Sequence, residues 1–176
     1  DAIDRTNVMI GIPATAEGVV AIEALLAEGI SVNATQILSP SHYEAVLLAT
    51  LHGLEKNPKP ASVSSVASVA VSRLDTAVDM ELERVGTNDS LSLRGKVAVA
   101  NCRVIYRRFE ELLESPQWTN LADKGARMQR LLWSSTTTEN LFYSDVLYVN
   151  ELVGPFTINS LSPATLQAYR DHGSRD

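Results

Sequence analysis

The sequence alternates between short apolar runs and longer segments with helical periodicity. The runs are too short for helices and rich in small or β-branched residues, which is typical of buried strands. The longer segments repeat apolar residues at intervals of three and four, which predicts helices packed along one side. The runs predict strands over residues 7–12, 31–38, 64–71, 129–135 and 156–161, and the periodic segments predict helices over residues 16–28, 40–54, 73–85, 93–114, 118–122, 144–153 and 163–171. Residues 56–60 and 86–92 are polar and predict connecting segments.

Strands that alternate with helices indicate an α/β fold built from parallel βα units. Two architectures share this pattern, a doubly wound open sheet and a (β/α)8 barrel. No G-x-G-x-x-G motif follows any strand, so a dinucleotide-binding fold has no phosphate loop here and no such cofactor is expected. Polar residues cluster at the strand ends, where barrel enzymes place their sites, which favours the barrel.

The composition narrows the class of protein. With 176 residues, 45% of them hydrophobic, the chain predicts a single domain over residues 1–176 with a sizeable core. A net charge of -6 opposes binding to nucleic acid, and an anionic substrate must meet a local positive site. No apolar run approaches the roughly 20 residues of a membrane-spanning helix. No basic or apolar leader follows Asp1, so no secretion signal is expected.

Cysteine and histidine usage predicts neither a disulfide nor a metal site. Cys102 is the only cysteine, which fits a reducing cytoplasm, and its helical spacing with Ile105 predicts a core residue rather than a nucleophile. His42, His52 and His172 lack the spacing of a zinc motif. We therefore expect a cytoplasmic protein without a metal or cofactor.

Many segments, in order along the chain, are similar to one known family. They include VMIGIPATAEG at 8–18, NAT at 33–35, SVASVAVSRLD at 65–75, RGK at 94–96, SPQW at 115–118, KGAR at 124–127, QRLLWSST at 129–136 and YSDVLYV at 143–149. Together they resemble transaldolase in its bacterial and cyanobacterial form, from about Asp4 to His172.

The resemblance implies a (β/α)8 barrel of which this chain supplies about strands four to eight. The three front strands, which in the family carry a catalytic Asp and a catalytic Glu, are then absent from the sequence. A five-strand piece leaves an open sheet edge with unpaired amides. We therefore expect another chain or segment to complete the barrel.

The first strand departs from the family pattern at Gly11. The family has a lysine at this place, which forms a Schiff base with a ketose phosphate. That chemistry needs a neutral amine as nucleophile, and glycine has no side chain. The resemblance therefore marks Gly11 as the position of the catalytic lysine, without its chemistry.

A second departure follows the fourth strand. The family typically carries Thr-Gly-Thr-Lys-Asn where this chain has Thr136-Thr137-Thr138-Glu139-Asn140. Glu139 replaces a base with an acid and would repel a phosphate. Two charge losses at site positions favour natural divergence over an engineered knock-out.

Five further residues are candidates for substrate binding. By the resemblance, Asn33 and Thr35 hold substrate hydroxyls and a water, and Ser68 and Arg73 lie on the phosphate side. Ser135 is a candidate for an additional hydroxyl donor. Structural alternatives stay open for three of these residues: Asn33 and Thr35 could belong to a polar barrel interior that is satisfied by its own neighbours. Arg73 could instead pair with an acid such as Asp75 or Glu44.

Three hypotheses follow for the function. The first is a divergent transaldolase-like protein that keeps a sugar-phosphate pocket but not the usual dihydroxyacetone transfer. The second is an ordinary transaldolase of the pentose phosphate pathway, acting on sedoheptulose 7-phosphate and glyceraldehyde 3-phosphate, with a mutated lysine. The third is a noncatalytic barrel subunit, because a fold does not fix a function.

Overall fold

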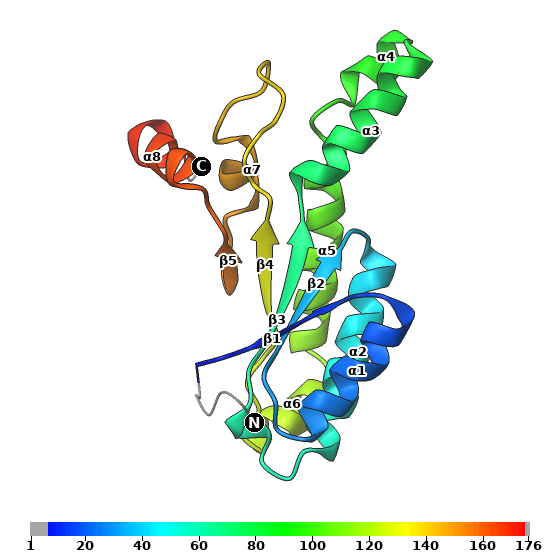
Figure 1. Cartoon of the computed structure of the whole chain (residues 1–176), viewed down its shortest axis with the longest axis vertical. Coiled ribbons are helices and arrows are strands. Elements are labelled where there is room, and N and C mark those ends of the chain that lie inside the picture. The colour runs from blue at the N-terminus through cyan, green and yellow to red at the C-terminus, as the bar shows by residue number, and fades with distance from the viewer. Residues whose placement is uncertain (1–6, 175–176) are drawn as a thin grey trace.

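The computed structural model describes residues 7–174, and these contain one parallel sheet of five strands (Figure 1). The strands lie side by side in chain order, and every neighbouring pair is parallel. They are β1 (Ile10–Pro13), β2 (Val32–Ile37), β3 (Ser65–Ala70), β4 (Arg130–Ser134) and β5 (Thr157–Asn159). The predicted α/β class is confirmed, and the sheet is consistent with part of a (β/α)8 barrel.

Helical segments separate consecutive strands. They are α1 (Ala16–Ala27), α2 (Pro40–Lys56), the 3-10 turn η1 (Pro60–Ser62), α3 (Ser72–Val85), α4 (Asn88–Ser92), α5 (Val97–Leu113), α6 (Pro116–Asp123), α7 (Leu147–Leu152) and α8 (Pro163–His172). In Figure 1, α3 and α4 project as an arm beyond the end of β3, at the same end as the loop after β4.

Most predicted boundaries differ from the structure by a few residues; the helix predicted from residue 93, for example, begins at Val97. Two of the differences have a clear physical cause. The first strand begins at Ile10 rather than at residue 7, because only residues from Ile10 onward find a partner in β2. The polar linker over residues 86–92 contains the short helix α4, which Thr87 caps by accepting a hydrogen bond from Ser90 N. One helical turn is too short to show periodicity, so the sequence pattern could not reveal it.

Hydroxyl side chains fix where most helices begin. Thr15, Ser39, Ser115 and Ser162 each accept a hydrogen bond from a backbone N–H in the first turn of the following helix. This satisfies an amide that has no partner within the helix. Proline follows at the first helical position of α2, α6 and α8, where its missing N–H costs nothing.

The hydrophobic core lies between one face of the sheet and the helices α1, α2 and α5. Ala34, Ala67 and Trp133 belong to it from the strand side. Cys102 is buried in the same core, as predicted, and burial raises the pKa of its thiol to about 12. A neutral, enclosed thiol of this kind is structural.

Among the described residues both edges of the sheet are unpaired, and the face opposite the helices is exposed at Gly11, half-buried at Asn33 and Leu132, and buried along β3. β1 and β5 each pair on one side only. Apolar side chains at the β1 edge remain exposed, including Val8, Met9 and Ile10. No helix within residues 7–174 has the length and apolar character needed to cross a bilayer.

Candidate functional site

The register of the parallel strands gathers polar residues on the face of the sheet opposite the helices. Gly11 pairs with Asn33, and Asn33 pairs with Val66. Residues side by side in a sheet share a face, and alternation adds Ser68 to it. The hydroxyl of Ser68 donates a 2.7 Å hydrogen bond to Oδ1 of Asn33. Two residues 35 positions apart in the sequence thus form one polar cluster.

Gly11 lies beside this cluster with free space above it. The residue is exposed, and an added Cβ would meet no atom within 4 Å. A side chain at this position would therefore fit and would project on the Asn33 face. Thr35 lies two residues further along β2, paired with Pro13, and its carbonyl accepts a hydrogen bond from Ala14 N.

Arg73 and Ser135 follow the carboxyl ends of the neighbouring strands β3 and β4. Ser135 has a left-handed backbone with φ 54°, which is uncommon for a residue other than glycine. Its carbonyl accepts a 2.9 Å hydrogen bond from the amide of Ser72, directly before Arg73. Such strain persists where neighbouring contacts impose it, and it is frequent at binding sites.

Arg73 itself is exposed at the start of α3 and forms no ion pair within the described residues. The alternative pairings with Asp75 and Glu44 are not formed. Glu44 pairs with Arg108 at 3.1 Å, and Asp75 accepts hydrogen bonds from a backbone amide and a tyrosine. The guanidinium is therefore free to meet a ligand.

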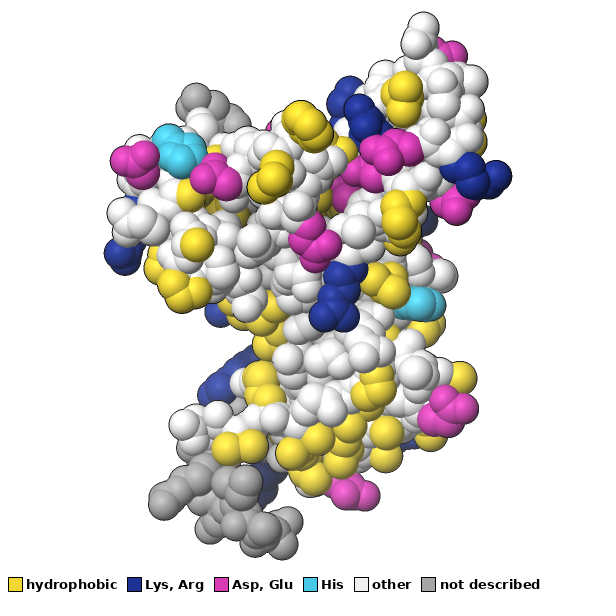
Figure 2. All heavy atoms as spheres, turned by 45° about the horizontal axis from the view of Figure 1, so that its top comes forward, with side chains coloured by type: hydrophobic (Ala, Val, Ile, Leu, Met, Phe, Trp, Pro, Cys, Tyr) yellow, Lys and Arg dark blue, Asp and Glu magenta, His cyan; other side chains and the backbone are white. Residues whose placement is uncertain are grey.

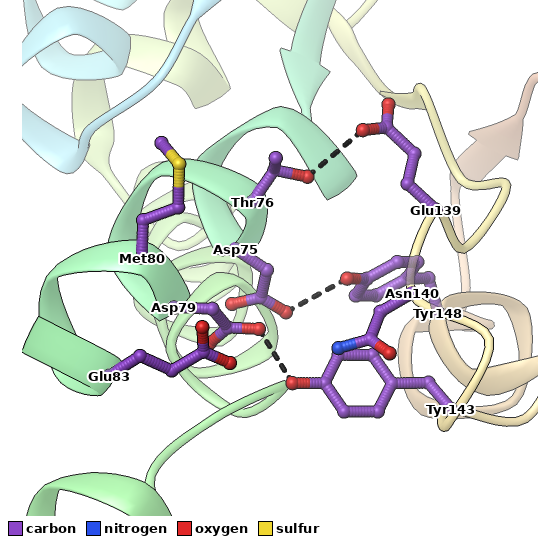
Figure 3. Close-up of a pocket in the computed structure, with 9 residues that line it drawn as sticks. All are labelled: Asp75, Thr76, Asp79, Met80, Glu83, Glu139, Asn140, Tyr143 and Tyr148. Carbon is purple, nitrogen blue, oxygen red and sulfur yellow. Dashed lines mark hydrogen bonds between the residues drawn. The ribbon is translucent and has the colours of Figure 1, made fainter. Parts of the chain in front are cut away.

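The same end of the molecule contains a hollow of about 320 Å³ between α3 and the segment after β4 (Figure 3). It is lined by Asp75, Thr76, Asp79, Met80, Glu83, Glu139, Asn140, Tyr143 and Tyr148. Acidic side chains gather at the base of the projecting arm (Figure 2). The hollow is acidic, and sequence reasoning did not find it.

Asp75 is the more deeply enclosed of the two buried carboxylates on α3. It is 1% exposed, accepts a 2.7 Å hydrogen bond from Ala98 N and a 3.0 Å bond from the hydroxyl of Tyr148. Helix α5 has no side-chain cap of its own, so Asp75 satisfies an amide of its first turn from outside. Burial raises the pKa of Asp75, although both hydrogen bonds act to lower it, and nearby Asp79 adds to the rise.

Asp79 lies one helical turn further along α3. It accepts a 3.1 Å hydrogen bond from Gly95 N and a 2.6 Å bond from the hydroxyl of Tyr143. Burial, together with the neighbouring Asp79 carboxylate, raises the pKa of Tyr143 to about 12. Both tyrosines therefore stay protonated and donate at neutral pH.

The raised pKa of Asp75 predicts a pH-dependent stability. A carboxyl whose native pKa exceeds its unfolded pKa of about 4 stabilises the fold fully below that value, and loses this contribution as pH rises through the native pKa. Asp75→Asn, which keeps an acceptor for Ala98 N, should therefore melt above the wild-type protein at pH 7.

Thermal melts between pH 4 and pH 7 test this prediction. The difference in Tm should shrink as the pH falls, because wild-type Asp75 then becomes neutral as well. Asp123→Asn, at an exposed carboxylate at the end of α6, is the matched control. A constant Tm difference at every pH would contradict the assignment.

Glu139 lies at the rim of this hollow. Its carboxylate accepts a 3.1 Å hydrogen bond from the hydroxyl of Thr76 on α3, and its side chain is exposed. The sequence predicted an acid near the site, and the structure places it opposite the first turns of the helix that begins beside Arg73.

A signal for the missed carboxylates does exist in the sequence. Asp75 and Asp79 are four residues apart and directly follow Leu74 and Val78 of the apolar stripe of α3. Acids next to a buried stripe are unusual unless partnered. Their partners lie 16 to 73 positions away, however, so spacing alone could not name them.

Within residues 7–174, the parallel sheet is unpaired at both edges and carries polar groups on one face and at its carboxyl ends, which is consistent with part of an α/β barrel whose site lies at the strand ends. The family model for transaldolase/fructose-6-phosphate aldolase matches residues 1–176. The chain belongs to this family, which confirms the resemblance read from the sequence.

Curated relatives named transaldolase support the assignment. The chain is 50% identical to the protein of Thermobifida fusca over 176 residues, which is 98% of this chain and 48% of that protein. It is 48% identical to the protein of Mycolicibacterium smegmatis and 49% identical to that of Acidothermus cellulolyticus, each over 97% of this chain and 47% of the relative. The chain thus spans about half the length of the curated relatives it matches.

Proposed function

We propose that this chain is a divergent part of a transaldolase-type barrel that keeps a sugar-phosphate pocket without the Schiff-base lysine. Asn33 and Thr35 would contact the sugar, Ser68 and Arg73 would contact the phosphate, and Ser135 would add a hydroxyl donor. The observation that carries the proposal is the register of Gly11 with Asn33, next to the Ser68 hydroxyl. A lysine at position 11 would stand beside these groups, whereas glycine leaves the space open.

The remaining lysines support the loss of Schiff-base chemistry. Lys56, Lys59, Lys96 and Lys124 are the four lysines of the sequence, and all are exposed. Schiff-base chemistry needs a lysine in a desolvated site that favours the neutral amine, and an exposed side chain has no such site. We therefore infer that ordinary dihydroxyacetone transfer does not occur on this chain.

The open sheet supports completion by a further segment. A (β/α)8 barrel needs three more strands between β5 and β1, and both of these edges lack a partner among the described residues. We propose that residues 1–176 form one barrel domain with that segment, in the same chain or another, and that the protein acts in the cytoplasm.

A second candidate is a noncatalytic barrel that binds a sugar phosphate or serves as a scaffold. It is favoured by the absence of a side chain at Gly11 together with the exposure of every lysine. This second candidate predicts that the protein binds a sugar phosphate without converting it. It differs from the first candidate only in having no catalytic activity.

A titration with fructose 6-phosphate, followed by NMR of the backbone amides, tests the pocket. Saturable shifts are expected at Asn33, Ser68, Arg73 and Ser135. Borohydride reduction of the same mixture should leave all four lysines unmodified. A covalent adduct at any lysine would favour the hypothesis of an ordinary transaldolase. An absence of shifts at these amides would refute the proposed pocket.

Charge reversal at Glu139 should strengthen anion binding. Glu139→Lys replaces repulsion of a phosphate by attraction, and near the surface this is worth ~0.5–1 kcal/mol, or a roughly two- to fivefold lower Kd. Titration with inorganic phosphate at low salt measures the change. Glu114→Lys, at the exposed far end of α5, is the control and should leave the Kd unaltered.

A further inference from the structure

We propose that Tyr143 and Tyr148 are positioning residues for the phosphate end of the pocket. Through Asp79 and Asp75 they hold residues 135–140 against the first turns of α3, and so fix Ser135 next to the residue before Arg73. This inference rests on the proposed function, because it concerns the same anion-binding groups.

A ladder of contacts joins α3 to the segment that follows β4. At its base, the amides of Val71 and Ser72 each donate a 2.9 Å hydrogen bond to the carbonyls of Ser134 and Ser135. One turn further along, the Thr76 hydroxyl donates to Glu139. The contacts of Asp75 and Asp79 with the tyrosines extend this ladder (Figure 3).

Apolar packing does not hold the tip of this segment. Leu141 and Phe142 are 99% and 95% exposed, so neither contributes to a core. A loop without buried apolar contacts depends on its polar anchors for order. The Tyr143–Asp79 hydrogen bond, at 2.6 Å, is the anchor directly after the tip, and Glu139 is the anchor before it.

The carboxylates are themselves fixed before they meet the tyrosines. Each uses one oxygen to accept a hydrogen bond from a backbone amide, that of Ala98 in the first turn of α5 for Asp75 and that of Gly95 in the turn before α5 for Asp79. Gly95 has φ 69°, and a Cβ at this position would come within 3.0 Å of the Tyr143 ring. The second oxygen of each acid is thus presented at a set place, with the Tyr143 ring packed on a glycine.

Ser135 has a strained backbone conformation, and such a conformation persists only if contacts around it hold it in place. A left-handed residue other than glycine relaxes unless its surroundings hold it. Ser72 holds the Ser135 carbonyl on one side, and Thr136 donates to Asn159 Oδ1 on the other. Without the tyrosine anchors the following residues gain freedom, and the geometry at Ser135 loosens with them.

Tyr143→Phe and Tyr148→Phe test the role, because each removes one hydroxyl and keeps the ring. In the full chain, the Kd for inorganic phosphate should rise at least threefold in each variant, measured well below the Tm. The amide resonance of Ser135 should shift, and proteolysis within residues 136–142 should accelerate. Tyr106→Phe is the matched control, since its hydroxyl donates to Pro155 O at 3.3 Å away from this loop.

A rescue separates positioning from bulk stability. Asp79→Asn keeps Oδ1 as the acceptor for Gly95 N and presents an amide N–H that the Tyr143 oxygen can accept, so it should keep the phosphate Kd within twofold of the wild-type value. Asp79→Ala should weaken binding as Tyr143→Phe does. A lower Tm in the tyrosine variants with an unchanged phosphate Kd would overturn the inference.

The wild-type titration distinguishes the two proposals. If the wild-type chain does not bind phosphate, the proposed function fails. The positioning role of Tyr143 and Tyr148 is then judged on the Ser135 resonance and the loop proteolysis alone. If Tyr143→Phe and Tyr148→Phe leave the resonance and the proteolysis rate at their wild-type values, the positioning role is overturned.

Discussion

Gly11→Lys is expected to create a lysine that borohydride traps with fructose 6-phosphate, once the barrel is complete. The position has free space for a side chain and lies in register with Asn33, so the new amine would stand beside the polar cluster. A lysine keeps an ordinary pKa of about 10.4 when it is exposed, and it becomes a nucleophile when desolvation lowers that value. Completion of the barrel supplies the desolvation.

The experiment has two arms and a matched control. Gly11→Lys is expressed alone, and also together with the unmatched half of the Thermobifida fusca relative. Mass spectrometry after reduction should find roughly tenfold more adduct in the second arm, because only there is the amine enclosed. Val20→Lys, on a 70% exposed position of α1, should give none in either arm.

An adduct in the completed Gly11→Lys protein would show that the remaining pocket still places a ketose beside residue 11. No adduct above the Val20→Lys level, with the two halves shown to associate, would contradict the assignment of Gly11 to the lysine position. The proposed pocket at Asn33 and Ser68 would then need a different reacting group.

Trp133→Ala is expected to lower the free energy of unfolding by about 3–5 kcal/mol, the largest effect of a single truncation in this chain. Trp133 is 1% exposed on the helix-facing side of β4, and its indole N–H donates a 2.8 Å hydrogen bond to Leu152 O. The change leaves a large cavity and an unpaired carbonyl. Urea unfolding measures the loss.

Two comparison variants make the result specific. Leu132→Ala, one residue earlier and on the opposite face, should cost about 1 kcal/mol, because Leu132 is only half-buried. Trp133→Phe should cost about 1–2 kcal/mol for the lost hydrogen bond, and it stays measurable if the alanine variant does not fold. Equal losses at positions 132 and 133 would contradict the two-sided sheet.

Much of the fold follows from local pattern. The strands and long helices were predictable because burial on one face imposes a period of two or 3.6 on the sequence. Helix starts such as Ser39-Pro40 can be predicted from the sequence, because a capping hydrogen bond joins residues only three positions apart. The start of β1 and the short helix α4 were not predictable. The first depends on where β2 offers partners, and the second is too short for the helical period to repeat.

Part of the candidate site could likewise be predicted from the sequence, and part could not. The resemblance singled out Asn33 and Ser68, and strand register then joined them by a hydrogen bond. The acidic hollow was missed, because Asp79 meets Tyr143 across 64 positions and Asp75 meets Tyr148 across 73. Only the packing of α3 beside the segment after β4 brings these groups together.

The sequence by itself determined the βα order, the family and the absence of a side chain at position 11, because each is written in residue identity or local periodicity. The tertiary structure alone decided that the acids of α3 are buried and paired with tyrosines, and that Ser135 is held in a strained conformation. The reason is physical: hydrogen bonds between distant segments depend on how helices pack on the sheet, and that packing is set by the whole chain.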